Sequence, residues 1–497
     1  MDNQNKALNT SLDSIRSNVK LKFGTKLSFA MGDIYTGGYF NIINFFYAIF
    51  LTDVVRISPV WAGVIFTASK IWDAITDPLM GAISDRTKSR FGRRRPYFLI
   101  GMPLIFLSFA MMWYPLSSGS EISKVIFYGF AYMLSNTVAT FVQVPFLSMA
   151  AEISTDYNER NSISGIRMFV SGASSLVCAV APMLIVSMYQ DVATGHFVMG
   201  VIFGLIFALP WLLVFRVKEP PIFASTAAEE TKKTGMFKLM VNTLKVKSFR
   251  RLLYMYLGIF VTMDLLAMME AYFLTYIVEA PELLSYILGI LLLFEVATMP
   301  LATFVTNKTS KVKVIIWGSS AWALLCLANL FITPATPHIV LYAISASIGV
   351  AIAFPIVGII SLFGDVTDVG ELYYGTRNEG SFFGVQQFTR KCASAIANGV
   401  TLSVIGFAGF INPVEEIRNG VTVLITQVQP DIVLFLIRGF MSFTGVLLIP
   451  TVIFAILWQL TPERHARMIE YLDKKRAGLP VDQEIETEMQ YLREKVL

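Results

Sequence analysis

Two carboxylates interrupt the apolar stretch KIWDAITDPLMGAI at positions 70–83. Asp73 and Asp77 are four residues apart, so on an α-helix they share one face, with Cβ atoms about 5–6 Å apart. Two ionised carboxylates that close repel each other in a dry site, so either one holds a proton or a cation lies between them. With the Thr76 hydroxyl, the acids predict a site for Na⁺ or for a transferable H⁺. No cofactor beyond this coupling ion is expected.

The stretch DRTKSRFGRRRP (85–96) follows, with six Lys or Arg among positions 86–95. Asp73 lies about 18 Å from this turn at a helical rise of 1.5 Å per residue, so the turn does not neutralise the acid pair. The basic residues are typical of a cytoplasmic turn that fixes topology, and Gly92 permits a tight bend. A second interpretation is a charge latch that closes the cytoplasmic side. The residues assigned to this gate are Asp85, Arg86, Arg90, Glu152, Asp156, Arg160, Asp365 and Asp368.

The amino-acid composition indicates that these charged residues belong to a membrane protein. Of the 497 residues, 55% are hydrophobic and 15% are charged, whereas about 25% are charged in an average soluble domain. The mean hydropathy is +0.61. Apolar runs of about 20 residues, long enough to cross a bilayer as a helix, recur twelve times. They cover residues 27–51, 61–83, 96–114, 124–150, 164–188, 194–216, 251–276, 283–305, 313–332, 338–362, 380–408 and 433–459.

Positive charge predicts the topology. Residues 1–26 are polar and do not resemble a cleavable signal peptide. Lys and Arg gather in every second loop and in the C-terminal tail, which by the positive-inside rule places both termini in the cytoplasm of a multi-pass protein of the cell (inner) membrane. The net charge of +5 therefore reflects topology. We expect the lipid bilayer as a partner, and no nucleic acid.

A polar interruption divides the spans into six and six. The expected parts are a cytoplasmic N-terminal segment (1–26), a six-helix bundle (27–216), a cytoplasmic linker (217–250), a second six-helix bundle (251–459) and a cytoplasmic tail (460–497). AEISTDYNERNSISG (151–165), after the fourth span, is echoed by GDVTDVGELYYGTRNEGSFFG (364–384), after the tenth. Duplicated six-span units predict an all-α membrane protein with the major facilitator fold of twelve transmembrane helices, and hence a transporter.

Further charges fall within the spans, where each costs at least about 2.5–3.5 kcal/mol on insertion scales. Arg167 and Lys391 lie in the fifth and eleventh spans. They either hold a polar or anionic substrate or form salt bridges that fix the bundles. Asp33 in the first span binds substrate or caps its helix. Asp264 and Glu270 are six residues apart and do not share a helical face, and Arg390 either snorkels or faces away from Lys391.

Four stretches resemble a known family: KLSFAMGDIYTGGYFNIINFFYAIFLTDV, WDAITDPLMGAISDRTKSRFGRRRPYFLIG, QVPFLSMAAEISTDYNERNSISGIRM and GDVTDVGELYYGTRNEGSFFGVQQFTRKCASA. They are similar to the glycoside–pentoside–hexuronide:cation symporters, the melibiose-permease group of the major facilitator superfamily. The resemblance implies Na⁺-, Li⁺- or H⁺-coupled sugar uptake by alternating access. It also implies that Asp73 and Asp77 bind the cation with help from Lys391, and that Arg167 lies at the sugar cavity.

Departures from the group concern the substrate. Where sodium-coupled melibiose permeases grip galactosyl hydroxyls with two aspartates, this chain has Gly37 and Gln143. Fewer acids beside two cations suit an anionic sugar such as a uronide, while a neutral glycoside or pentoside stays open. A sodium-coupled lysophospholipid or other organic-anion transporter of the same superfamily is the alternative. The residues assigned to the substrate are Asp33, Gly37, Gln143, Arg167 and Lys391.

Other features point away from catalysis. The three cysteines lie in spans without metal-ligand spacing, and the three histidines lie at span ends or in the tail, so we expect no enzyme. Residues 462–497 carry apolar side chains at helical spacing and predict two short amphipathic helices. The stretch 409–432 is predicted to be an outer loop, and it carries no recognisable chemistry.

Overall fold

The computed structural model describes residues 21–116, 119–153, 157–219, 243–374, 379–418, 421–476 and 483–493. The chain divides into two compact units. The first comprises Met1–Phe223 with Leu402–Gln429, and the second comprises Ala224–Thr401 with Pro430–Leu497. Most of the predicted linker, 217–250, lies outside the described residues.

The first span of the first unit is not one regular helix. It begins as α2 (Phe23–Ala30), restarts as α3 (Asp33–Ile42), and continues through two π-helical segments, Ile43–Tyr47 and Phe50–Val54. Gly32 lies at the break, where a Cβ atom would come within 2.8 Å of the Phe146 ring. Such interruptions re-aim side chains and often mark functional positions.

The remaining helices of the first unit are long enough to cross a bilayer. They are α4 (Pro59–Arg86), α5 (Arg95–Met112), α6 (Glu121–Glu152), α7 (Tyr157–Val186), and α8 (Val192–Ala208) followed by the short α9 (Trp211–Arg216). In this unit α4 packs on α6, and α3 packs on α7. These two helix pairs position the charged side chains described below.

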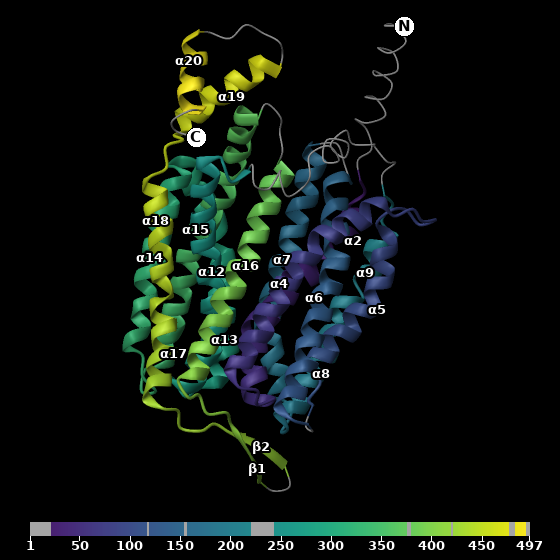
Figure 1. Ribbon diagram of the computed structural model, residues 1–497, viewed down its shortest axis with the longest axis vertical. Helices are drawn as coiled ribbons and strands as arrows, with labels where there is room; N and C mark the ends of the chain where they lie inside the picture. Colours follow the sequence, from purple (N-terminus) through teal and green to yellow (C-terminus); the bar gives the residue numbers. More distant parts are fainter. Residues whose placement is uncertain are drawn as a thin grey trace. The chain divides into compact units, whose positions relative to one another are not determined.

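The second unit repeats the plan. Its helices are α12 (Lys247–Tyr276), α13 (Leu284–Lys308), α14 (Lys311–Leu327), α15 (His338–Tyr374), α16 (Glu379–Phe407), and α17 (Asp431–Phe443) continued by α18 (Leu448–Ile456). Short 3₁₀ turns at Pro281–Leu283, Ala328–Phe331 and Thr444–Leu447 join or extend them. Close approach at Gly349, where a Cβ atom would lie 2.2 Å from the Leu291 carbonyl oxygen, lets α13 and α15 pack tightly. Figure 1 labels these elements.

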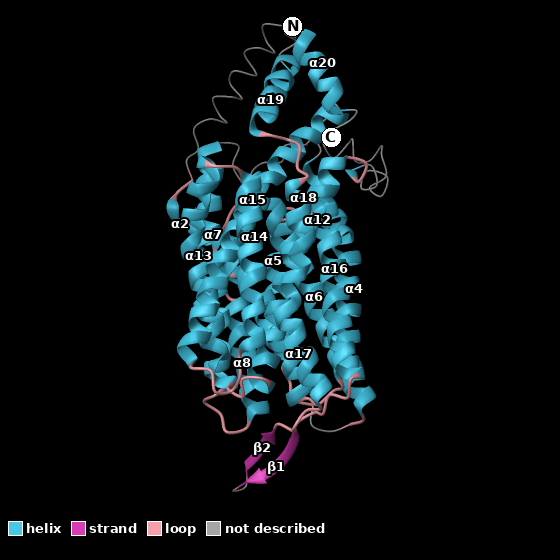
Figure 2. Cartoon of the chain, turned by 90° about the vertical axis from the view of Figure 1, so that its left-hand side faces the viewer, coloured by secondary structure: helices cyan, strands magenta, loops and turns pink. Residues whose placement is uncertain are grey.

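One element was missed from the sequence. The predicted outer loop 409–432 contains strands β1 (Val414–Arg418) and β2 (Val421–Ile425), which pair antiparallel with Val414 opposite Ile425. Figure 2 shows them as the strands among the described residues. The sequence between them is Asn-Gly, the pair most favoured in two-residue hairpin turns, so the signal was present.

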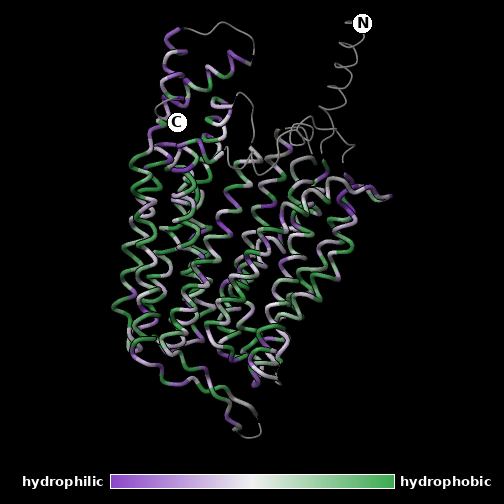
Figure 3. Tube along the Cα trace, viewed as in Figure 1, coloured by the Kyte–Doolittle hydropathy of each residue, from purple (hydrophilic) through white to green (hydrophobic). Residues whose placement is uncertain are grey.

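The two predicted tail helices are confirmed as α19 (Pro462–Arg476) and α20 (Gln483–Tyr491). Their apolar side chains are buried, with Met468 and Leu492 at 0% exposure and Met489 at 2%. Figure 3 shows the contrast between these polar helices and the apolar helices of the spans. One side of the tail helices therefore packs against protein, while many of their other side chains are exposed.

Twelve helical segments of the described chain correspond to the twelve predicted spans. Nine described segments are long and apolar enough to cross a membrane by length and composition. The other three are the broken first span, α4 and α16, which carry the buried charges or the interruptions. The predicted all-helical membrane fold is confirmed.

Candidate cation and substrate sites

The acid pair faces α6. Asp73 is 3% exposed, and Asp77 is half-buried one turn further along α4. Thr140 of α6 places its hydroxyl oxygen 2.8 Å from Asp73 Oδ1 and 2.8 Å from Asp77 Oδ1. The four-residue spacing therefore brings both acids to one hydroxyl on the neighbouring helix, as the sequence predicted for the shared face.

Hydrogen counting constrains the charge of this cluster. A threonine hydroxyl has one proton to donate, so Thr140 donates to only one of the two carboxyl groups. The other contact is a hydrogen bond only when that carboxyl is protonated and donates to the Thr140 oxygen. With both acids ionised, one oxygen–oxygen contact has no proton, and a nearby positive charge would offset the repulsion. That this charge is the coupling H⁺ or a metal ion stays a prediction.

Two further residues of α4 adjoin the acids. The Thr76 hydroxyl donates to the Asp73 backbone carbonyl at 3.1 Å, and its role as a cation ligand stays a prediction. Lys70, one turn before Asp73, is 8% exposed, and its Nζ lies 5.7 Å from the centroid of the Phe40 ring. Helical spacing places this buried lysine on the same face of α4 as Asp73, three residues away.

Gln143 lies three residues after Thr140 on α6. Its Nε2 is buried and has no hydrogen-bond partner among the described residues. A buried amide without a partner loses the hydrogen bond that water would give it, at a cost of about 1–3 kcal/mol. Its role in holding substrate stays a prediction, and the orphan donor is what a ligand hydroxyl or carboxylate would satisfy.

Asp33 and Arg167 form a bidentate ion pair between α3 and α7. Arg167 Nε lies 2.6 Å from Asp33 Oδ2, and Nη2 lies 3.0 Å from Oδ1. The guanidinium also lies 4.7 Å from the Phe146 ring centroid. Asp33 makes no helix-capping contact, since the N-cap residue is Gly32 and its cap has no side-chain hydrogen bond. The alternative of a helix cap is therefore wrong, and the salt bridge foreseen for Arg167 is present.

Gly37 lies one turn after Asp33 and faces α7. A Cβ atom there would come within 2.6 Å of the Ser171 carbonyl oxygen and 2.9 Å of its Cα. The position thus serves close helix packing, which an aspartate would prevent without a shift of α7. Its assignment to the substrate stays untested.

The second unit contains a related pair that the sequence did not predict. Arg390 Nη2 of α16 lies 3.6 Å from Asp264 Oδ1 of α12, and the guanidinium lies 4.3 Å from the Phe260 ring centroid. Ser394, one turn after Arg390, donates to Asp264 Oδ2. Arg390 therefore faces the protein and not the lipid. Lys391 is half-buried beside it, and its substrate role stays a prediction.

The basic turn has a partner that the sequence did not single out. Glu219, three residues after α9, accepts hydrogen bonds from the backbone N–H groups of Arg93, Arg94 and Arg95 at 2.7–2.8 Å. These are donors at the start of α5, where a carboxylate also complements the helix dipole. Gly92 has φ +111°, and a Cβ atom there would lie 2.7 Å from Glu219 Oε1. The tight bend expected at Gly92 is present.

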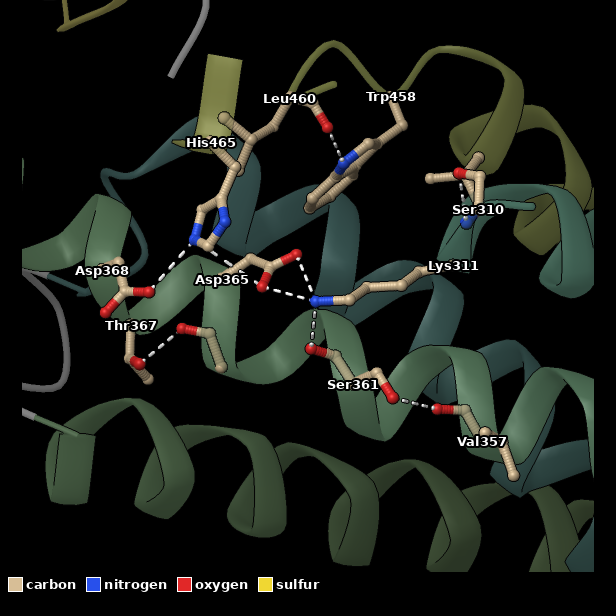
Figure 4. Close-up of polar contacts among 12 residues, drawn as sticks. Ser310, Lys311, Val357, Ser361, Asp365, Thr367, Asp368, Trp458, Leu460 and His465 are labelled. Carbon is tan, nitrogen blue, oxygen red and sulfur yellow. Dashed lines mark hydrogen bonds and ion pairs between the residues drawn. The ribbon is translucent and has the colours of Figure 1, made fainter. Parts of the chain in front are cut away.

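The gate is only partly described. Asp156 and the side chains of Asp85, Arg86, Glu152 and Arg160 lie outside the described part of the chain. Arg90 is exposed and stacks on Phe91 at 4.7 Å. Asp365 and Asp368 of α15 have side-chain partners: Lys311 Nζ lies 2.7 Å from Asp365 Oδ1, and His465 Nε2 lies 3.1 Å from Asp368 Oδ2 (Figure 4). Their role in gating stays a prediction.

A model of the family described as MFS/sugar transport protein matches residues 28–461. The chain belongs to this family. This member of the MFS/sugar transport protein family is 26% identical over 426 residues to the putative glycoside/cation symporter YagG of Escherichia coli, covering 80% of this chain and 87% of that protein. It is also 26% identical over 426 residues to sodium-dependent lysophosphatidylcholine symporter 1 of Mus musculus, covering 78% of each.

The solved structure of a D-xylose-proton symporter has the same fold. It covers 89% of this chain and 98% of its own, with a TM-score of 0.61 and 16% identity. The resemblance to cation symporters of the superfamily is confirmed, and the family member is a multi-pass membrane transporter.

Sequence reasoning missed several residues of this transporter's sites. Thr140 and Lys70 lie on the helix faces that carry Gln143 and the acid pair, so helical spacing from those residues was the available signal. The Asp264–Arg390 pair had a subtler signal. A phenylalanine stands four residues before each aspartate, at Phe29 and Phe260, in the first helix of each half. Both rings lie within 6 Å of the paired guanidinium.

Proposed function

We propose that this family member is a cation-coupled symporter that imports a sugar, glycoside or uronide by alternating access. The observation that carries the proposal is the Thr140 hydroxyl shared by Asp73 and Asp77 at 2.8 Å each. A buried acid pair that requires one proton or one cation is a site that changes charge when the coupling ion binds. Intramembrane carboxylates of this kind mark ion pathways in transporters.

In this proposal Asp73 and Asp77 bind Na⁺ or H⁺ with the hydroxyls of Thr140 and Thr76. Hard oxygen donors on two adjacent helices suit either ion. Binding of the cation neutralises the acid pair. The exposure of α4 to water can then change during the transport cycle without leaving an unpaired charge in the protein. No cofactor beyond the coupling ion takes part.

In this proposal Gln143, Arg167 and Asp33 of the first unit hold the substrate, and the substrate role of Lys391 in the second unit stays a prediction of its own. Asp–Arg pairs present planar sets of donors and acceptors that match vicinal hydroxyls or a carboxylate. Gly37 and Gln143 stand where the melibiose permeases carry aspartates, so fewer acids oppose a substrate with a negative charge, such as a uronide. The named activity of the E. coli relative, glycoside/cation symport, is consistent with this substrate class.

The second candidate is transport of a lysophospholipid. The named activity of the mouse relative is sodium-dependent lysophosphatidylcholine symport, and the similarity extends over 78% of both chains. We rank it second because lysophosphatidylcholine pairs a long acyl chain with its headgroup, while the buried polar side chains described above suit a small polar molecule. For localisation, we infer the cell (inner) membrane with both termini in the cytoplasm, from the positive-inside pattern.

Uptake into proteoliposomes tests the function. The protein is reconstituted, a Na⁺ or H⁺ gradient is imposed, and labelled glycosides, uronides and lysophosphatidylcholine are screened. Asp73→Asn and Asp77→Asn should abolish gradient-driven accumulation. Asp53→Asn is the matched control, because Asp53 is a buried aspartate of the first span that accepts from the Thr52 hydroxyl at 2.7 Å. Full accumulation by both acid-pair variants would show that the cation site is wrong, and binding without counterflow would indicate a receptor.

A further inference from the structure

The C-terminal helix pair is attached to the end of α15 by named polar contacts. His465 in the first turns of α19 places Nε2 3.1 Å from Asp368 Oδ2 and 3.7 Å from Asp365 Oδ1. Beyond α20, the Arg493 guanidinium donates to the Tyr373 carbonyl oxygen at 2.9 Å. The tail therefore contacts α15 at two places, more than one helical turn apart.

The two aspartates differ in the charge they offer the imidazole (Figure 4). Asp365 accepts two hydrogen bonds from Lys311 Nζ, at 2.7 and 2.9 Å, and Lys311 also donates to the Ser361 carbonyl oxygen. Asp365 is thus largely neutralised by α14. Asp368 lies closer to the imidazole than Asp365 does, so its carboxylate gains most from a positive charge on His465.

Several other charged groups of the described tail, and Glu371 of α15, have contacts or positions of their own. Arg467 lies 2.8 Å from Glu488 and ties α19 to α20. The hydrogen bond and charge of Glu488 raise the pKa of Arg467, so it stays cationic. Arg464 donates to the Gln459 carbonyl oxygen. The pKa of Glu463 is lowered by hydrogen bonds from its own backbone N–H and the Thr461 hydroxyl, so it titrates in more acidic solution than a free glutamate. Glu371 lies one turn beyond Asp368 on α15 and is buried.

We propose that α19–α20 is a proton-gated brake on the transporter, held against α15 when His465 is protonated. Histidine side chains generally change charge between about pH 5 and 8. A protonated imidazole forms an ion pair with Asp368 and adds an attraction to Asp365. A neutral imidazole retains at most a hydrogen bond. The bound tail restrains the end of α15. This restraint slows the helix movements of the transport cycle.

The sign of the effect follows from linkage. A positive charge on His465 adds an ion pair with Asp368 to the contacts of the docked tail, so docking should be stronger at low pH than at high pH. The partly exposed ion pair is expected to change the ratio of docked to released tail about fivefold. Glu463 has the opposite pH dependence. Because its pKa is lowered, its contribution to the stability of the docked tail is present at neutral pH and is lost as the pH falls.

Hydrogen exchange of the full-length protein in nanodiscs tests the docking. Amide exchange in 462–476 is measured at pH 6 and pH 8 and normalised to an unstructured peptide at each pH. In the wild type, exchange should be about fivefold slower at pH 6. His465→Lys keeps a positive charge at both pH values, so its amide exchange should be slow at both. His465→Gln carries no charge, so its amide exchange should be fast at both. His338→Gln, at the exposed start of α15, is the matched control and should behave as the wild type.

Turnover tests the brake. Substrate exchange by the same variants should be slower at pH 6 for wild type and His465→Lys than for His465→Gln, whatever the substrate or coupling ion proves to be. A wild-type pH response of tail hydrogen exchange that is retained in His465→Gln would overturn the role of the imidazole. Equal turnover of the Lys and Gln variants would overturn the brake, and neither result bears on the acid pair of α4.

Discussion

Replacement of Thr140 by valine removes the hydroxyl shared by the acid pair and preserves the shape of the side chain. Thr140 Oγ1 lies 2.8 Å from one oxygen of each carboxyl group. A hydrogen bond to a charged group contributes about 1.5–3 kcal/mol. At about 1.4 kcal/mol per factor of ten, the loss of one such bond should weaken binding of the coupling cation about 10- to 100-fold.

Thermal unfolding in detergent at increasing Na⁺, Li⁺ or H⁺ concentration measures this change. A ligand at 100 times its Kd stabilises the folded state by about 2.7 kcal/mol, and a tenfold weaker Kd reduces this to about 1.4 kcal/mol at the same concentration. The apparent melting temperature of Thr140→Val should therefore respond much less to the cation that couples transport. Gradient-driven accumulation should fall in parallel.

Thr137→Val is the matched control for this experiment. Thr137 lies three residues earlier on α6, where its hydroxyl donates to the Met133 carbonyl oxygen at 2.8 Å and accepts from Trp72 Nε1 at 2.9 Å. The same substitution there leaves the acid pair intact and should keep cation affinity. The reasoning fails if Thr140→Val binds the cation within twofold of the wild type, or if both variants weaken it equally.

Three further substitutions test other contacts. Gly92→Ala forces a side chain into φ +111° against Glu219 and should destabilise the first unit by at least about 1 kcal/mol, measured by thermal unfolding. Glu219→Gln removes the carboxylate charge at the start of α5 and should cost about 1–2 kcal/mol in the same assay; no change would mean that water replaces it. Arg167→Gln leaves Asp33 buried and unpaired and should cost about 3–5 kcal/mol, and adding Asp33→Asn should recover much of the loss. Additive effects in that double-mutant cycle would contradict the ion pair.

Features that depend on position along one helix were predictable from the sequence. The shared face of Asp73 and Asp77 follows from a spacing of four, and the tail helices follow from Met468 and Leu472 at helical spacing. The twelve spans were predictable for the same reason, because the length and the hydropathy of an apolar run are local properties of the sequence. The hairpin at 414–425 was also local, but its position within a predicted loop hid the Asn-Gly signal.

Partners across helices were not predictable, because one sequence does not say which face meets which neighbour. Thr140 lies 67 residues from Asp73 in the sequence. Glu219 lies at least 124 residues from the arginines whose backbone N–H groups donate to it. Asp365 and Asp368 were assigned to a gate by their echo of the first half, but Lys311 and His465, their partners, carry no motif. In each case the missing information is the packing of α4 on α6, of α5 on α9 or of α15 on α14 and α19.

The two Asp–Arg pairs show how internal duplication partly supplies that information. In both units an aspartate of the first helix meets an arginine of the fifth, and a phenylalanine four residues before the aspartate lies beside the guanidinium. The arginines are not at equivalent depths, since Arg167 follows its Arg-Asn turn by 7 residues and Arg390 follows its own by 13. In the first pair the guanidinium contacts both carboxylate oxygens, at 2.6 and 3.0 Å, whereas in the second Arg390 lies 3.6 Å from one oxygen and Ser394 donates to the other. Duplication therefore predicts which helices of each unit supply the two partners. The position of each arginine along its helix and the geometry of its pair depend instead on how the helices of that unit pack.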